Sequence, residues 1–187
     1  MKCVRSESTI RLCFSPEVRL SSGGPAVFLD RDGVINRKIP GGYVTDWRHF
    51  EFVPGILPAM ASLAELGVPV IVISNQACVG KGLLSRRLLS GMTQRFTRFV
   101  REGGGRIDAV YYCPHTAESG CGCRKPRPGM LERAARDFAI DLRASVFVGD
   151  SPTDVEAAAA VGCASIVLLG QEDSVDAYPP GCAFVRS

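Results

Sequence analysis

The hydrophobic positions of the chain follow two alternating patterns. Short apolar runs, rich in valine and isoleucine, predict buried strands, while apolar residues spaced three and four apart predict helices with one buried face. The predicted strands cover residues 27–29, 68–73, 107–112, 146–148 and 164–169. The predicted helices cover residues 54–66, 86–101, 128–138 and an alanine-rich segment that ends near 161. Strands that alternate with helices in this way form right-handed βαβ units and a mainly parallel sheet with helices on both faces.

The fold class that this order predicts is α/β: a single Rossmann-like domain over residues 26–187, with a mainly parallel sheet flanked by helices. Residues 1–25 have no sustained period and end in Ser-Ser-Gly-Gly-Pro, so we expect a flexible N-terminal extension. Residues 183–187 predict a last strand with no helix after it, which would leave one face of the sheet bare. We therefore expect a monomer or a weak homodimer.

The composition is that of one soluble globular domain, with 187 residues, of which 46% are hydrophobic and 22% charged. A formal net charge of +3, without a dense lysine and arginine block, does not indicate a nucleic-acid partner. No apolar run approaches the roughly 20 residues of a membrane helix, and the first 25 residues lack the apolar stretch of a secretory signal. We therefore expect a cytoplasmic protein with no membrane or nucleic-acid partner. In that reducing compartment, clustered cysteines are better explained as metal ligands than as disulfides.

Polar residues follow the predicted strands at one end of the sheet. Asp30-Arg31-Asp32-Gly33 follows the first strand, Ser74-Asn75-Gln76 the second, and Gly149-Asp150 with Asp154 the fourth, while Arg124-Lys125 ends the loop after the third. Open α/β sheets bind ligands outside the carboxyl ends of their parallel strands. The sequence therefore predicts one site on this rim.

Asp30 and Asp32 can face one side of an extended chain, where two carboxylates repel each other unless a cation or a shared proton intervenes. Magnesium prefers oxygen ligands and could be held by Asp30, Asp150 and the backbone carbonyl of Asp32. With a phosphate monoester bound, Asp30 could attack phosphorus, and Asp32 could act as acid and base if burial and neighbouring acids raise its pKa. Ser74 and Lys125 could donate hydrogen bonds to the transferred group. Taken alone, such an acidic pair is more often a polar turn.

In this order, the four polar clusters resemble the motifs of the haloacid dehalogenase superfamily of phosphatases, over about residues 26–169. The resemblance implies that Asp30 is the nucleophile, Asp32 the acid and base, and Asp150 a magnesium ligand. Predicted helices, strands and loops fill the segments between the motifs, which leaves no room for a cap domain. We therefore expect an open site, with a flap of residues 37–52 beside it.

A loop after the third predicted strand carries four residues of the types that bind zinc: Cys113, His115, Cys121 and Cys123. They form two i, i+2 pairs separated by five residues, a spacing that allows a tetrahedral Cys₃His site. Four protein ligands leave no open coordination position, so this zinc would be structural and would hold Arg124 and Lys125 at the rim. A redox pair of cysteines and a chance cluster are the alternatives.

The zinc loop followed by Arg-Lys-Pro is similar to one branch of the superfamily, in which D-glycero-D-manno-heptose-1,7-bisphosphate 7-phosphatases and histidinol-phosphate phosphatase domains share it. Asn36 and the Gly42-Tyr43-Val44 segment favour the heptose family. This resemblance implies Mg2+ and Zn2+ as cofactors and hydrolysis of the 7-phosphate of a small phosphorylated sugar through an aspartyl-phosphate. It also implies a substrate pocket formed by Gly41, Gly42, Tyr43, Ser74, Asn75, Gln76, Arg124 and Lys125.

Two alternative functions stay open. One is a histidinol-phosphate phosphatase, and the other is a zinc-stabilised binding module that has lost catalysis, against which the intact set of acids argues. Ala77-Cys78 stands where this branch usually has a small hydroxyl residue and glycine. If that position needs φ above zero, Cys78 is strained and the pocket is altered.

Overall fold

A seven-stranded sheet organises the computed structural model, which describes residues 9–14, 23–170 and 174–186. The strands are β1 (Ile10–Cys13), β2 (Val27–Leu29), β3 (Val70–Asn75), β4 (Ala109–Cys113), β5 (Val146–Gly149), β6 (Ala164–Leu169) and β7 (Ala183–Arg186). The α-helices are α1 (Ile56–Glu65), α2 (Ala77–Gly80), α3 (Arg86–Glu102), α4 (Gly129–Phe138) and α5 (Pro152–Ala159). Short 3-10 helices form at η1 (Trp47–His49), η2 (Ala117–Ser119), η3 (Leu142–Ala144) and η4 (Val175–Ala177).

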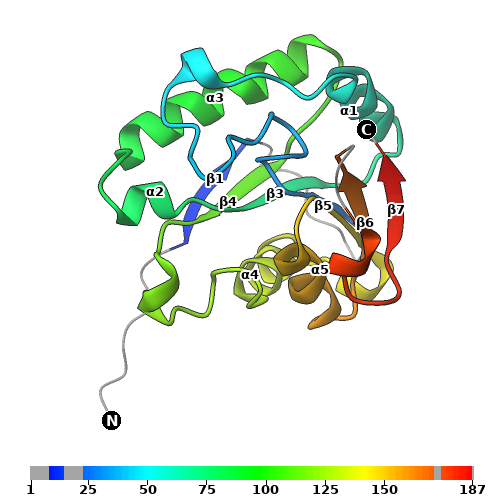
Figure 1. Cartoon of the computed structure of the whole chain (residues 1–187). Helices are drawn as coiled ribbons and strands as arrows, with labels where there is room; N and C mark the ends of the chain where they lie inside the picture. The colour runs from blue at the N-terminus through cyan, green and yellow to red at the C-terminus, as the bar shows by residue number, and fades with distance from the viewer. Residues whose placement is uncertain (1–8, 15–22, 171–173, 187) are drawn as a thin grey trace.

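The strands lie in the order β1-β4-β3-β2-β5-β6-β7, and all neighbours are parallel except β1 and β4. Helices α1 and α3 cover one face of the sheet, and α4 and α5 cover the other (Figure 1). Side chains alternate between the faces along β2, where Val27 and Leu29 join one core and Phe28 joins the other. Because both faces are covered, the central strands are continuous apolar runs. The predicted α/β class is confirmed.

The connections of β2 open a crevice at its carboxyl end. β2 pairs with β3 on one side and with β5 on the other, so the connections of the two halves of the sheet diverge here. Asp30 is the first residue after β2. Within residues 23–170, the chain between β2 and β3 holds only a loop with η1 and helix α1, and the chain between β3 and β4 holds α2 and α3. No cap domain covers the crevice in this part of the chain.

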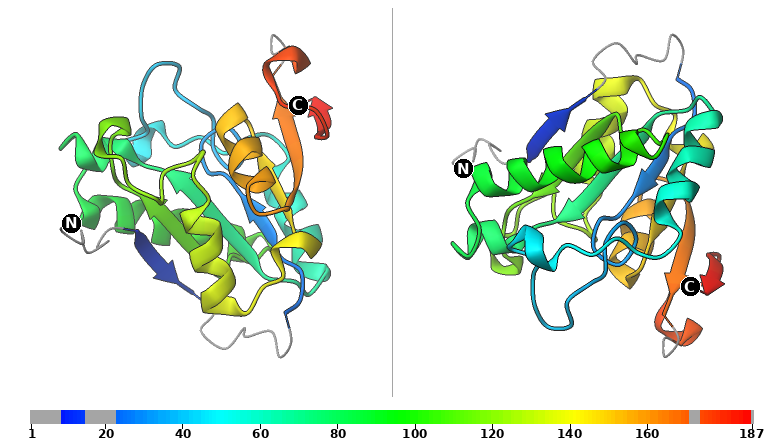
Figure 2. Two further views of the ribbon diagram at one scale, coloured as in Figure 1. Left: turned by 90° about the horizontal axis from the view of Figure 1, so that it is seen from below. Right: turned by 90° about the horizontal axis from the view of Figure 1, so that it is seen from above.

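The N-terminal segment contains a strand that the sequence pattern did not predict. β1 pairs antiparallel with β4 at one edge of the sheet (Figure 2), with Ile10 and Leu12 packed on the core. The guanidinium of Arg11 lies 3.4 Å from the Asp137 carboxylate on α4. The expectation of a flexible extension is therefore wrong for residues 10–13, since a four-residue alternation is too short to detect in a polar segment. Residues 1–8 and 15–22, which the same expectation covered, lie outside the described residues.

The opposite edge of the sheet is formed by β7, which pairs parallel with β6 (Figure 2). This confirms the predicted last strand. All four of its residues are exposed, including Phe184 and Val185. The fold of a single chain does not test the expected monomer or weak homodimer, which stays a prediction. Among the described helices, none has the length and apolar character needed to cross a membrane.

Helix α3 offers a matched test of the core. Leu89 is fully buried in the core, whereas its neighbour Leu88 is 60% exposed. We expect Leu89→Ala to lower the free energy of unfolding by about 2–5 kcal/mol, because it removes buried methyl groups and leaves a cavity. Leu88→Ala should change the free energy by no more than about 0.5 kcal/mol. Chemical denaturation of both variants measures the difference, and equal effects would contradict this packing of α3.

Candidate active site

A cleft of about 240 Å³ lies at the carboxyl ends of the central strands. Residues from the acidic loop after β2, the flap, β3, the zinc loop and the segment after β5 line it: Asp30, Asp32, Lys38, Ile39, Gly42, Tyr43, Val44, Ser74, Asn75, Arg124, Lys125, Asp150, Ser151 and Thr153. The topology of the sheet therefore brings together rim residues that lie far apart in the sequence.

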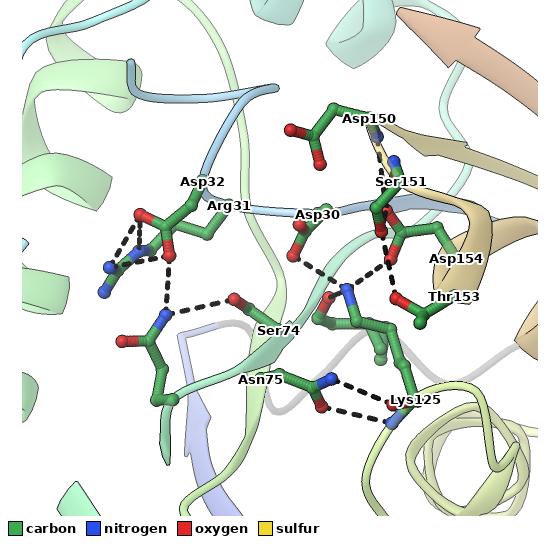
Figure 3. Close-up of polar contacts among 12 residues, drawn as sticks. Asp30, Arg31, Asp32, Ser74, Asn75, Lys125, Asp150, Ser151, Thr153 and Asp154 are labelled. Carbon is green, nitrogen blue, oxygen red and sulfur yellow. Dashed lines mark hydrogen bonds and ion pairs between the residues drawn. The ribbon is translucent and has the colours of Figure 1, made fainter. Parts of the chain in front are cut away.

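The floor of the cleft is a buried charge cluster (Figure 3). The Lys125 ammonium lies 2.9 Å from Oδ1 of Asp30 and 2.5 Å from Oδ1 of Asp154, and it donates a 3.0 Å hydrogen bond to the Ile73 carbonyl. Burial lowers the pKa of Lys125, but the two carboxylates more than offset this, and its pKa is raised overall. Lys125 therefore stays charged in the interior because its partners are acids.

Asp154 also organises the loop that follows β5. Its Oδ2 accepts hydrogen bonds from the backbone N–H groups of Asp150 and Ser151 and from the Ser151 hydroxyl, the last at 2.7 Å. Ser151 and Asp154 form a capping box at the start of α5. Gly149 fits only because it has no Cβ, since a Cβ there would overlap the Asp154 side chain. Both oxygens of Asp154 are thus occupied by the protein itself.

The arrangement of Asp30, Asp150 and Asp154 suits a divalent cation. One oxygen from each lies within 4.8 Å of the others. Among the described residues, Oδ1 of Asp150 is buried without a partner, and Oδ1 of Asp30 contacts only the Lys125 ammonium. Burial raises the pKa of Asp30 to about 7, helped by the charges of Asp154 and Asp150 and opposed by Lys125. A cation at this point would stabilise the ionised acids and satisfy the free oxygen.

Asp32 points away from this cluster (Figure 3). Its carboxylate accepts bonds of 2.8 and 2.9 Å from the Arg31 guanidinium, one of 2.9 Å from Asn36 and one of 2.7 Å from Gln76. Burial raises the pKa of Asp32, but the Arg31 charge and these hydrogen bonds more than offset it, so its pKa is lowered overall. The expectation of a raised pKa is wrong for this conformation, because an arginine and two amides, rather than another acid, surround the carboxylate.

Arg31 is a functional neighbour that the sequence analysis missed. Its side chain is 1% exposed and lies with its guanidinium 5.9 Å from the centre of the Tyr112 ring. Arg31 enters the core while Asp30 faces the cleft, and the Asp32 carboxylate turns back to contact the Arg31 guanidinium. The sequence signal for it is a basic residue between two acids, just after a buried strand.

The three residues of the Ser74-Asn75-Gln76 segment make different contacts. Ser74 lies in the cleft, where its hydroxyl accepts a 3.1 Å bond from Gln76. The Asn75 side chain makes two bonds of 3.1 Å with the backbone N–H and carbonyl of Lys125. Gln76 is 1% exposed and does not line the cleft. In this structure the Gln76 amide holds Asp32 and Ser74, and its implied substrate role stays a prediction.

The flap contacts the cleft at one end and the protein core at the other. Lys38, Gly42 and Tyr43 line the cleft, but Gly41, which the resemblance placed in the pocket, does not. At the far end, Trp47 stacks on Phe50 and Phe99 with ring centroids 4.8 and 5.7 Å apart, and further aromatic pairs join Phe52 and Phe96. The aromatic cluster fixes the flap against α3.

The four residues of the zinc loop converge. Their sulfur atoms and His115 Nδ1 lie 3.3–3.6 Å apart in five of the pairs. Ligands on a tetrahedral zinc with bonds of about 2.3 Å lie ~3.7 Å apart, so the cluster fits that ion. Hydrogen bonds, the largest from Cys113, lower the pKa of Cys123 to about 5 and favour the thiolate form that metals bind. The loop can therefore hold a metal ion and fixes Arg124 and Lys125 directly after its last ligand.

Cys78 is unstrained. It lies in α2, and the only residue other than glycine with positive φ in the described part of the chain is Ala139. Its buried thiol lies 3.4 Å from Oε1 of Gln76. The concern that Cys78 distorts the pocket is therefore not supported, because the backbone here is helical and accepts any side chain.

Comparison with known proteins identifies the family. A family model described as HAD-hydrolase-like matches residues 122–180. The D-glycero-beta-D-manno-heptose-1,7-bisphosphate 7-phosphatase of Vibrio cholerae is 42% identical over 153 residues, which cover 78% of this chain and 81% of that protein. The chain belongs to this phosphatase family. The predicted membership of the haloacid dehalogenase superfamily and the predicted phosphatase class are thereby confirmed.

Further relatives of this phosphatase differ in the anomer that their names specify. The D-glycero-alpha-D-manno-heptose-1,7-bisphosphate 7-phosphatase of Mycobacterium tuberculosis is 41% identical over 150 residues, covering 77% of this chain and 79% of that protein. A crystal structure of the D,D-heptose 1,7-bisphosphate phosphatase of B. bronchiseptica, complexed with magnesium and phosphate, superposes with a TM-score of 0.79. It is 33% identical in sequence and covers 86% of this chain and 92% of that one.

Gly33 provides a test of the site geometry. It has a φ of +97°, and a Cβ at this position would overlap the Asp150 carboxylate. We expect Gly33→Ala to displace Asp150 and to lower the hydrolysis of p-nitrophenyl phosphate about a hundredfold, the scale of a 1 Å misplacement at a catalytic site.

Gly55→Ala is the matched control for backbone strain. Gly55 has a φ of +78°, but apart from its chain neighbours no described residue has an atom within 4 Å of its Cβ position. It should lose about 1–2 kcal/mol of stability to backbone strain and keep its activity. Melting curves and phosphate release are measured on both variants, and equal losses of activity would show that overlap with Asp150 is unimportant.

Proposed function

We propose that this phosphatase removes the 7-phosphate of D-glycero-D-manno-heptose 1,7-bisphosphate through an aspartyl-phosphate at Asp30, with magnesium as cofactor. The observation that carries the proposal is the cluster at the cleft floor, where Asp30 lies 2.9 Å from Lys125 and shares a ligand cluster with Asp150. Relatives at 42% and 41% identity that are named for this substrate support the choice of sugar.

In the first step, an oxygen of Asp30 attacks phosphorus and forms an acyl-phosphate bond. The bond from phosphorus to the sugar O7 breaks, and its electron pair stays on O7, which takes a proton from Asp32. The Lys125 ammonium and the Ser74 hydroxyl bind the oxygens of the transferred group. In the second step, Asp32 takes a proton from water, whose oxygen attacks phosphorus and releases inorganic phosphate and the Asp30 carboxylate.

Asp30, Asp150 and the backbone carbonyl of Asp32 would hold the magnesium ion. When bound, it cancels the repulsion between the anionic nucleophile and the anionic substrate. Asp154 is close enough to be a fourth candidate ligand, but its bonds to Lys125 and to the loop after β5 favour a positioning role. Asp154 fixes both the Lys125 ammonium and the backbone that carries Asp150.

Asp32 must change its contacts during the cycle. The conformation bound to Arg31 stabilises the carboxylate, which is the form that accepts a proton from water. To protonate O7, Asp32 has to leave Arg31 and turn into the cleft, where the negative charge of the substrate favours its acid form. Arg31 therefore stabilises the base form that Asp32 takes between the first and the second step.

The two alternative functions are a histidinol-phosphate phosphatase and a binding module without catalytic activity. The relatives from Vibrio cholerae and Mycobacterium tuberculosis are named for heptose bisphosphates rather than for histidinol phosphate, and the acids of the floor are all in place, which disfavours a silent binding module. Relatives named for the alpha and the beta anomer are almost equally similar to this chain, at 41% and 42% identity. We therefore assign the 1,7-bisphosphate as substrate without choosing an anomer. The expected cytoplasmic location stays a prediction.

Phosphate release from both anomers of the heptose 1,7-bisphosphate, with histidinol phosphate as comparison, tests the substrate. We expect magnesium-dependent hydrolysis of the bisphosphate at C7 and much slower hydrolysis of histidinol phosphate. Phosphorus NMR identifies which phosphate is released. Asp30→Asn should lower the rate about a thousandfold or more, because the amide cannot form the acyl-phosphate. A folded wild-type protein that prefers histidinol phosphate, or an active Asp30→Asn variant, would refute the proposal.

Metal analysis tests the zinc loop. We expect about one zinc per chain in the wild type and none in Cys121→Ser, because the cluster has four ligands and a structural site needs all of them. The variant should also melt at a lower temperature, since zinc binding contributes to folding. Cys13→Ser, at an exposed cysteine outside the cluster, is the control and should retain zinc. Equal zinc in both variants would exclude the assignment.

A further inference from the structure

Within the described residues, Lys38 is the one flap residue whose charge reaches the acids of the site. Its Nζ lies 2.9 Å from Oδ2 of Asp150, and its side chain is 55% exposed. The adjacent Arg37 points elsewhere and lies 3.7 Å from the Glu51 carboxylate. Asp150 is a ligand in the proposed magnesium site. In this structure, the Lys38 ammonium instead provides the positive charge next to its carboxylate.

Lys38 and Lys125 differ in how firmly the protein holds them. Lys125 is 3% exposed and contacts two carboxylates and a backbone carbonyl. For Lys38, the described residues provide one ion pair, with Asp150. A single ion pair on a half-exposed, flexible side chain contributes little to stability. Lys38 can therefore exchange its partner readily, whereas Lys125 cannot.

A divalent cation on Asp150 would drive such an exchange. It repels the nearby ammonium and takes over the carboxylate that held it. The flap then keeps Lys38 at the mouth of the cleft, which Arg124 of the zinc loop also lines. The Arg124 guanidinium donates a 3.3 Å bond to the His115 carbonyl and is only partly buried. The side chains of Lys38 and Arg124, from two separate loops, thus line the cleft in addition to the residues that would bind the transferred phosphate.

We propose that Lys38 leaves Asp150 when the metal binds and then binds the second phosphate of the substrate, together with Arg124. This inference rests on the proposed function and assigns to Lys38 the selection of a bisphosphate over a monophosphate. The chemistry recognised is a phosphate dianion, for which an ammonium on a flexible stem is a suitable partner. No covalent step involves Lys38.

Kinetics of Lys38→Met on two substrates test the proposal. We compare kcat/KM for the heptose 1,7-bisphosphate and for the heptose 7-phosphate. The ratio of the two should fall about tenfold in Lys38→Met, the scale of one charge-assisted hydrogen bond. Lys38→Arg should retain most of the ratio because it keeps the charge. Arg37→Met, which makes the same change in net charge one residue away, should leave the ratio as in the wild type.

Magnesium titration without substrate gives a second readout. By isothermal calorimetry, magnesium should bind Lys38→Met several-fold more tightly than the wild type, because no ammonium competes for Asp150. Arg37→Met should bind it as the wild type does. A merely structural role for Lys38 predicts the reverse, weaker binding of the metal.

Three outcomes would overturn the inference. An unchanged substrate ratio in Lys38→Met refutes the phosphate contact, while the wild-type activity preserves the proposed function. Equal losses on both substrates with weaker magnesium binding would show that Lys38 only supports the metal site. A folded wild type that hydrolyses neither substrate would remove the proposed function and this inference with it.

Discussion

The repulsion among three closely spaced carboxylates, two of them buried, is the constraint on which the site depends. Asp30, Asp150 and Asp154 follow two strands that are neighbours only in the folded sheet, and Lys125 supplies one positive charge among them. Even with the half-exposed Lys38 beside Asp150, two ammonium groups cannot neutralise three ionised acids, and one Asp150 oxygen is satisfied by no described residue. The parts of the chain around it, including two glycines that leave space for the carboxylates, keep these charges in place.

Two irregular loops complete the site, and each is fixed by contacts other than regular hydrogen bonding. The flap depends on stacked aromatic rings around Trp47, and the second loop depends on the cluster of three thiols and His115. Loops that carry functional residues need such anchors because they lack the repetitive hydrogen bonds of helices and strands. The Asn75 side chain adds a further link, since it pairs with the backbone of Lys125 as a neighbouring strand would.

The sequence predicted the sheet, the rim and the convergence of three cysteines with His115, because these rest on periodicity and on spacing along the chain. Asp30, Ser74 and Lys125 could be placed together because parallel strands end at one edge. It did not predict β1, whose four residues alternate too briefly, or the contacts of Asp32. The direction of that side chain depends on Arg31 and Gln76, whose burial is set by tertiary packing. Sequence patterns indicate which residues meet, but side-chain conformation and pKa depend on neighbours from distant segments.

The absence of an inserted domain between β2 and β4 has a consequence for the fate of the acyl-phosphate. An intermediate on Asp30 would form in a cleft that no inserted domain covers, where water is in large excess. Alcohol acceptors at cellular concentrations would have to compete with that excess. The open architecture therefore favours hydrolysis over phosphoryl transfer to a second metabolite, and this follows from the shape of the fold rather than from any single side chain.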